Sequence, residues 1–295
     1  MKKKTLRLFL FGIFLIGLNT DCIFAQQMQD SVVIHPQKIK TKQIIIVSAI
    51  AIDQALSFYI EYQWWWKGNY HPFELEPIET ENYSYSIDKV GHFYTSYLYY
   101  HAINEIMKYG EFSKRTRTIT SIAIPFTYAL SIELGDGYSR YNFSFFDLAS
   151  NSLGICYGVL QDRFKYLKNI NVKFSYFPSQ KYFENQFKRW SLTEDYDGHI
   201  YWLTFNVHHL LPKNMKKNWP EFLNTAIGYG VNNFGSNIPL QREFFIGFDY
   251  NLDAIQTKNK AIKSAINIID KFHFPAPGFK KTGDDNFTPK WLLLN

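Results

Sequence analysis

The chain has 295 residues, of which 46% are hydrophobic, 20% charged and 19% aromatic. Such a chain can bury a sizeable core, which excludes a mainly disordered protein, and 16 Gly with 11 Pro exclude collagen-like and low-complexity classes. The formal net charge of +6 is not gathered into a basic stripe, so no nucleic-acid partner is expected.

The N-terminus has the pattern of an export signal. Four basic residues precede an uncharged apolar run over residues 8–20, and Ala25 supplies the small residue of a cleavage site. Residues 1–25 are therefore predicted to be a signal peptide, and the mature chain is expected in the periplasm or on the periplasmic face of an envelope membrane. Cleavage lowers the formal charge from +6 to +3. Lipid attachment at Cys22 is an alternative, although the three preceding residues are unlike a lipobox.

Four helical segments are expected in a domain over residues 40–168. Apolar periodicity places them at about residues 42–62, 87–109, 116–134 and 144–164. Ser144, three residues before Asp147, is expected to cap the last of these helices, and Gly135 is expected to end the third. Cys156 lies in an apolar run and is expected in the core, whereas four glutamates between residues 74 and 81 are expected to form a solvated loop.

Residues 169–295 are expected to form a smaller, β-containing region. Strand-like alternation occupies residues 200–205, 225–231 and 243–250, and an amphipathic helix is predicted at about residues 258–271. The proline-bearing tail after His273 is expected to be a loop. The predicted fold class is α+β, with an N-terminal bundle of about four helices.

Membrane contact is expected without a complete span. The second, third and fourth helical segments have uncharged runs of only 14 or 15 residues, whereas a span needs about 18–20. The first segment would place Asp53 inside the bilayer, which is costly unless the carboxylate is paired. The run Trp64-Trp65-Trp66 is typical of an interfacial anchor, or it packs over the end of a helical bundle.

Polar residues interrupt the apolar segments at ends that antiparallel helices would bring together. Short connections place the start of the second segment beside the end of the third and the start of the fourth. The residues expected to gather there are Asp88, Lys89, His92, Glu133, Asp136, Asp147 and Asn151. We call these seven residues the polar cluster.

Two hypotheses explain the polar cluster. In the first it is a site, with His92, Asp88 and Asp147 as candidate metal ligands or acid–base groups. In the second it is an internal hydrogen-bond network that fixes how three helices meet. Motifs for a zinc protease, a serine hydrolase or a phosphate loop do not occur, so the sequence identifies no cofactor.

The order of these residues resembles a known family. The resemblance rests on Asp88-Lys89-x-x-His92-Phe93, Glu133-x-x-Asp136-Gly137 and Phe143-Ser144-x-x-Asp147-x-x-x-Asn151-x-x-Gly154. These motifs resemble the YfiM-like predicted periplasmic lipoprotein family, domain of unknown function 2279, in its Bacteroidetes type. The helical part is also similar to VanZ-like membrane proteins, whose pattern includes an arginine that Arg140 would match. The resemblance implies an envelope location, a helical architecture and a shared polar cluster, but no reaction.

Two classes of function remain open. The first is a membrane-associated, non-enzymatic envelope protein that binds a lipid or another envelope component at the membrane surface. The second is a metal- or His/Asp-dependent hydrolase or transferase that acts on an envelope lipid or polymer. The sequence identifies no protein partner.

Overall fold

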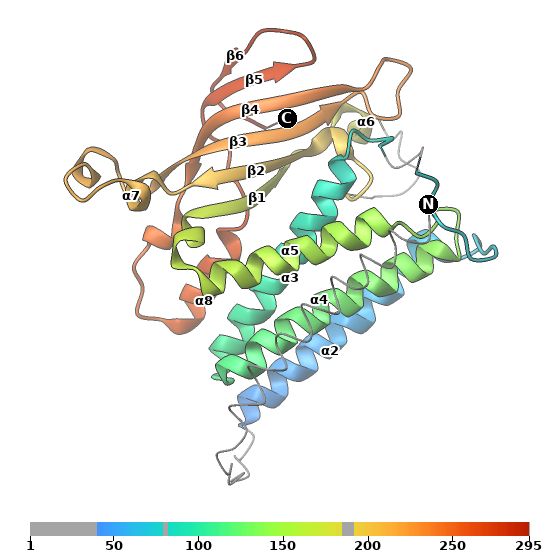
Figure 1. The fold of residues 1–295 in the computed structure, drawn as a ribbon, viewed down its shortest axis with the longest axis horizontal. Helices are drawn as coiled ribbons and strands as arrows, with labels where there is room; N and C mark the ends of the chain where they lie inside the picture. The colour runs from blue at the N-terminus through green and yellow to red at the C-terminus, as the bar shows by residue number, and fades with distance from the viewer. Residues whose placement is uncertain (1–39, 79–81, 185–191, 295) are drawn as a thin grey trace, which may run out of the picture. The chain divides into compact units, whose positions relative to one another are not determined.

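Helices precede strands along the chain, as the sequence predicts. The computed structural model describes residues 40–78, 82–184 and 192–294, and these hold seven α-helices and one six-stranded antiparallel sheet (Figure 1). The α+β class is confirmed. The chain has more helices than the four expected in the N-terminal bundle, because three further helices lie among the strands, of which the sequence predicts only the last. The expected signal peptide and Cys22 lie outside the described residues.

The four long helices begin and end close to the expected positions. They are α2 (Thr41–Glu61), α3 (Ile87–Tyr109), α4 (Lys114–Gly137) and α5 (Phe145–Arg163). Ser144 accepts a hydrogen bond from the Asp147 N–H, which confirms the predicted cap of α5. Helix α4 does not end at Gly135. It continues to Gly137, and Gly135 serves inside the helix to admit the Trp66 ring, which lies only 2.2 Å from where a Cβ on Gly135 would be.

Helix α3 is the centre of the helical layer and contacts α4, α5 and the sheet. A Cβ on Gly154 of α5 would lie 2.1 Å from the backbone carbonyl oxygen of Phe93, so only glycine permits this approach to α3. The face of α5 that carries Gly154 is turned toward α3. Cys156 lies off this face and is exposed, so the expectation that it belongs to the core is wrong.

The six strands follow one another in chain order across the sheet. They are β1 (Ile170–Tyr176), β2 (His199–Phe205), β3 (Leu223–Asn232), β4 (Gln241–Tyr250), β5 (Gly278–Thr282) and β6 (Thr288–Lys290). The tail after His273 is therefore not only a loop, since it supplies β5 and β6. Pro289 is tolerated in β6 because this strand is at the edge of the sheet.

Three short helices accompany the strands. They are α6 (Gln180–Phe183), α7 (Val207–Leu210) and α8 (Lys260–Ile269). Helix α8 was predicted from its apolar face, and it contacts α3. The other two helices have four residues each, too few for periodicity to reveal them.

The two faces of the sheet are covered differently. On one face Trp202, Phe245 and Leu293 of the C-terminal tail are each 1% exposed. On the other face α3 packs against β1, β2 and one end of β3, where Tyr97, Tyr201 and Val231 belong to one core cluster. The rest of this second face, on the middle of β3 and on β4 and β5, is not covered by the described residues.

Apolar side chains occupy this open part of the sheet. Ile227, Ile246 and Phe279 lie side by side in the register of β3, β4 and β5. Each of these three side chains is about half exposed, at 48%, 49% and 50%. Exposed apolar patches of this kind mark surfaces that bind another molecule.

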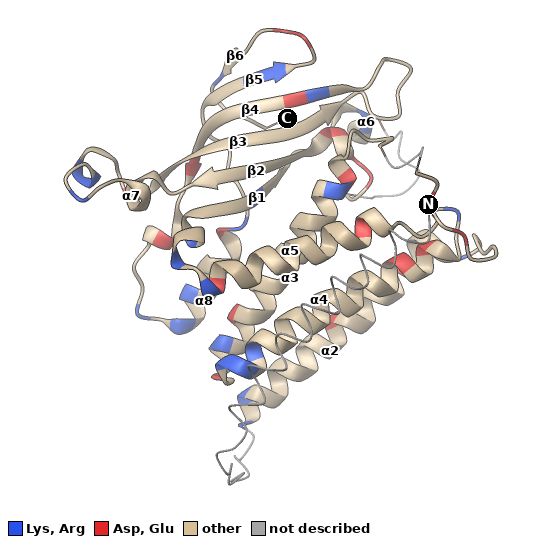
Figure 2. Cartoon of the chain, in the orientation of Figure 1, with Lys and Arg blue, Asp and Glu red and all other residues tan. Residues whose placement is uncertain are grey.

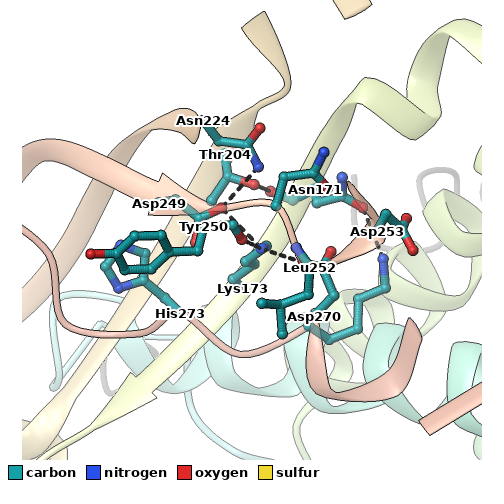
Figure 3. Close-up of polar contacts among 12 residues, drawn as sticks. Asn171, Lys173, Thr204, Asn224, Asp249, Tyr250, Leu252, Asp253, Asp270 and His273 are labelled. Carbon is teal, nitrogen blue, oxygen red and sulfur yellow. Dashed lines mark hydrogen bonds and ion pairs between the residues drawn. The ribbon is translucent and has the colours of Figure 1, made fainter. Parts of the chain in front are cut away.

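A buried ion network links β1 to β4, which is not its neighbour in the sheet. The Nζ of Lys173 lies 2.9 Å from Asp249 Oδ2 and 3.0 Å from Asp270 Oδ1 (Figure 3). Lys173 also donates to the Tyr250 carbonyl, and Asn224 donates to Asp249, both at 3.0 Å. Lys173 and Asp249 are completely buried. The network connects residues that are far apart in the sequence.

Helix α2 exposes most of its apolar side chains. The residues more than half exposed are Ile44, Ile45, Val47, Ile52, Leu56 and Tyr59. Together with a π-helical turn, η1 (Tyr62–Trp66), α2 forms a 26-residue segment. Its most apolar 18-residue window has a mean hydropathy of 1.7, and only 6% of that window is buried. Among the described residues it is the one helix long and apolar enough to cross a membrane.

The uncharged-run criterion overlooks this segment because Asp53 interrupts it. In the structure the Tyr99 hydroxyl of α3 donates a hydrogen bond to the Asp53 carboxylate. Gln54 donates to the same carboxylate at 3.3 Å. Pairing of this kind lowers the cost of an acidic side chain in lipid. Asp53 is therefore compatible with a position in the membrane.

Candidate functional site

The polar cluster gathers at one end of the helical layer. The start of α3 supplies Asp88, Lys89 and His92, the end of α4 supplies Glu133 and Asp136, and the start of α5 supplies Asp147 and Asn151. Figure 2 shows acidic residues at this end of α4 and basic residues at its other end. The antiparallel arrangement of α3 and α4 and the short return to α5 produce this meeting, as expected from the order of the segments.

Lys89 holds carboxylates from two helices together. Its Nζ lies 3.1 Å from Asp88 Oδ2 and 2.9 Å from Asp147 Oδ1. Glu76, from the loop before α3, approaches to 3.9 Å and its side chain is only 12% exposed. Glu76 is thus not solvated as the sequence suggests. It joins the cluster because its backbone N–H is bonded to the Phe143 carbonyl at 2.9 Å.

His92 lies between carboxylates of α4 and α5. Its Nδ1 is 3.1 Å from Asn151 Nδ2 and 4.0 Å from Glu133 Oε1, while its Nε2 is 3.7 Å from Asp147 Oδ1. Asn151 in turn accepts a hydrogen bond from the Ser96 hydroxyl at 2.8 Å. Ser96 was not predicted, although it follows His92 by four residues on the same face of α3.

The three expected metal-ligand candidates do not all meet. His92 and Asp147 come together with Glu133, and one ligand atom of each lies within 4.8 Å of the others. Asp88 lies outside this group because the Ser84 hydroxyl donates to one of its oxygens and Lys89 donates to the other at 3.1 Å. The role of Asp88 in the cluster is to bind Lys89.

Glu133 is the most deeply buried acid of the cluster. It is 1% exposed, and its Oε2 accepts a hydrogen bond from the Ser144 N–H at 3.2 Å, whereas its Oε1 has no hydrogen-bond partner. Burial, reinforced by the charges of Asp147 and Asp136, raises the pKa of Glu133 from 4.5 to about 9. Burial also raises the pKa of Asp136 to about 7, although Trp66 Nε1 donates to it at 2.7 Å.

The protein, treated with a chelator to remove any bound metal ion, is expected to become less stable as the pH rises from about 5 to about 9. Folded Glu133 keeps its proton up to a pKa of about 9, whereas the unfolded chain loses it near 4.5. The folded state therefore binds more protons in this interval, and raising the pH favours unfolding. Urea titrations at three pH values should show that the free energy of unfolding changes less with pH for Glu133→Gln than for wild type. A wild-type profile as flat as that of the variant contradicts a protonated Glu133.

Arg140 does not take the place that the VanZ-like resemblance suggests. It follows α4, and its guanidinium lies 4.8 Å from the centre of the Tyr141 ring and donates to the Tyr141 hydroxyl at 2.8 Å. The side chain is exposed. These contacts give no support to a role for Arg140 in the polar cluster.

An apolar cavity of about 540 Å³ lies between α3 and the sheet. Its volume is within the roughly 300–1,000 Å³ of typical ligand pockets. Every lining residue in the described part of the chain is apolar, aromatic or glycine. They include Val90 and Phe93 of α3 and Ile227 and Ile246 of the sheet. The sequence could not reveal this cavity, because it depends on how α3 meets the second face of the sheet.

Helix α3 separates the two features. Lys89 and His92 contact the residues of the polar cluster, whereas Val90 and Phe93 line the cavity. The two sets alternate within two helical turns and therefore lie on different faces of one helix. Substitutions in one feature can thus be designed to leave the other unchanged.

The structure defines an α+β protein with an exposed apolar helix, a buried polar cluster and an apolar cavity. Residues 78–163 match the model of a family described as predicted periplasmic lipoprotein (DUF2279). The match spans α3, α4 and α5, confirms the resemblance drawn from the motifs, and agrees with an exported, periplasmic protein. No curated protein and no solved structure matches the chain significantly. The signal-peptide boundary, lipid attachment, the YfiM-like and Bacteroidetes-type details and the VanZ-like similarity stay predictions.

Proposed function

We propose that this envelope protein is anchored in the membrane by α2 and binds the acyl chain of an envelope lipid. The observation that carries the proposal is the apolar cavity between α3 and the sheet. An acyl chain offers only apolar groups, so this lining accepts it without leaving polar groups unpaired. The cavity opens where Ile227 and Ile246 are 48% and 49% exposed.

The exposed surface of α2 supports the same proposal. Most of its large apolar side chains are exposed, although Ile46 is buried, and Trp64, just after its end, is 45% exposed. Tryptophan at the end of an apolar helix is typical of the boundary between hydrocarbon and water. An anchor of this kind would keep the cavity next to its source of lipid.

The proposal is tested with the detergent-purified protein and cis-parinaric acid, a fluorescent fatty acid, as the probe. Wild type should bind it, and native mass spectrometry should detect co-purified lipid. The double variant Ile227→Asp/Ile246→Asp places carboxylates in the cavity and should bind at least about 30-fold more weakly, because each buried charge opposes the acyl chain.

Ile262→Asp is the matched control, since Ile262 of α8 is also half exposed, at 50%, but does not line the cavity. The control should bind as wild type does. Circular dichroism establishes that each variant is folded. Folded wild type that binds no probe, or a double variant that binds as well as wild type, contradicts the proposal.

A second candidate function is acid–base catalysis on an envelope lipid or polymer. It is favoured by one observation, the protonated carboxyl of Glu133 with its Oε1 at 4.0 Å from the His92 imidazole. A neutral carboxyl group beside an imidazole can act as a general acid and base. Turnover of phospholipid by wild type, lost in His92→Gln, would favour catalysis over binding alone.

A further inference from the structure

The polar cluster contains a buried acceptor atom that helix packing does not use. Glu133 is 1% exposed, and its Oε1 has no hydrogen-bond partner although Oε2 is bonded to the Ser144 N–H. This free oxygen is turned toward the His92 ring, 4.0 Å from Nδ1. Buried polar atoms are nearly always paired, so an unpaired one points to a group that completes the site.

Donor atoms from three helices converge at this position. His92 of α3, Glu133 of α4 and Asp147 of α5 each offer one atom, and these atoms lie within 4.8 Å of one another. We propose that the polar cluster binds one divalent transition-metal ion through these three side chains. An imidazole nitrogen with two carboxylate oxygens is a ligand set that suits Zn²⁺ or Mn²⁺. This inference goes beyond lipid binding and does not depend on it.

The charge balance of the cluster favours a cation. The carboxyl groups that surround Lys89 or Glu133 are Asp88, Asp136, Asp147 and Glu76. Lys89 supplies one positive charge to this acidic set. A divalent cation bound among these carboxyl groups would offset their mutual repulsion.

Asn151 is placed to orient the imidazole of His92. An ion on Nε2 requires a protonated Nδ1 with a hydrogen-bond acceptor, and the Asn151 amide lies 3.1 Å from Nδ1. The oxygen and nitrogen of an amide exchange places by a flip, after which the oxygen can accept from Nδ1. The Ser96 hydroxyl, now donating to Asn151, can equally accept from its nitrogen. Asn151 is thus a positioning residue.

The test is calorimetric titration of the chelator-treated, detergent-purified chain with Zn²⁺ and with Mn²⁺ at pH 7.5. At least one ion should bind at one site per chain. Glu133→Gln and His92→Gln should each weaken binding more than about 100-fold, because loss of a direct ligand exceeds the 10–100-fold typical of outer-shell changes. Asn151→Leu should weaken metal binding about 10- to 100-fold, because Asn151 positions His92 and is not itself a ligand.

One control separates the cluster from other sites. The adjacent pair His208 and His209 could bind zinc adventitiously, and the double change to glutamine should have no effect.

Melting curves establish that each variant is folded. If Glu133→Gln does not fold, His92→Gln decides the outcome. The proposal is overturned if neither ion binds to folded wild type or if His92→Gln binds as wild type does. The Ile227→Asp/Ile246→Asp variant should keep its metal while losing the fatty acid, so failure of one proposal is distinguishable from failure of the other.

Discussion

Replacing Lys173 by methionine should lower the free energy of unfolding by about 3–5 kcal/mol, the range for breaking a buried ion pair from one side. Lys173 is completely buried between Asp249 and Asp270. Methionine fills a similar volume but leaves two buried carboxylates without their cation. Urea unfolding at pH 7 measures the effect. A loss below about 1 kcal/mol would show that the carboxylates find other partners.

The matched control is Lys263→Met. Lys263 pairs with Asp253 at 3.2 Å, but both side chains are exposed, at 38% and 60%. Exposed pairs contribute at most about 1 kcal/mol, so the control should be nearly neutral. The comparison separates the effect of burial from that of removing a positive charge.

The pH dependence of the same variant gives a second measurement. Burial raises the pKa of Asp249 and of Asp270, and Lys173 opposes that rise in both. Without Lys173 the two carboxyl groups should therefore take up protons more readily, and the loss of stability should shrink as the pH is lowered. Adding Asp249→Asn and Asp270→Asn to Lys173→Met should restore part of the loss at pH 7, because neutral amides are cheaper to bury than charges.

The sequence could not predict this ion network. Strand β1 was not predicted, and Lys173 is separated from Asp249 and Asp270 by most of the C-terminal region. A charged residue in a strand is normally expected to face solvent. Lys173, Asp249 and Asp270 are instead buried where distant parts of the chain pack together. Long-range pairing of this kind has no local signal.

The polar cluster was predictable for the opposite reason. Its members lie at helix ends, and helix periodicity and short connections are local features that fix which ends meet. Which atoms contact one another inside the cluster was not predictable. Glu133 rather than Asp88 faces His92 because Ser84 and Lys89 engage Asp88, and side-chain pairing depends on rotamers that no spacing rule specifies.

Charged substitutions on the exposed face of α2 should release the protein from the membrane. Ile45 and Ile52 are 63% and 60% exposed, so Ile45→Asp and Ile52→Asp should spare the packing of the helix. At the centre of a spanning helix an isoleucine contributes about −0.5 kcal/mol to insertion, whereas an aspartate costs about 3 kcal/mol. Ile52 lies near the middle of the Thr41–Trp66 segment and Ile45 near its start, so the two changes together should disfavour insertion by more than about 3.5 and less than about 7 kcal/mol.

Carbonate extraction of membranes measures this result. Wild type should remain with the membrane until detergent is added, and the double variant should appear in the soluble fraction. Ile238→Asp/Ile262→Asp adds the same charge at isoleucines that are 60% and 50% exposed outside α2, and this control should stay with the membrane.

Lipid attachment would hide the effect, so the comparison is made in a Cys22→Ala background. A double variant that stays in the membrane pellet in that background would exclude α2 as the anchor. Because α2 already carries Asp53, the test depends on where an aspartate lies and not only on its presence in the helix. Asp53 is already hydrogen-bonded by Tyr99, whereas an aspartate at Ile45 or Ile52 would face the lipid without such a partner.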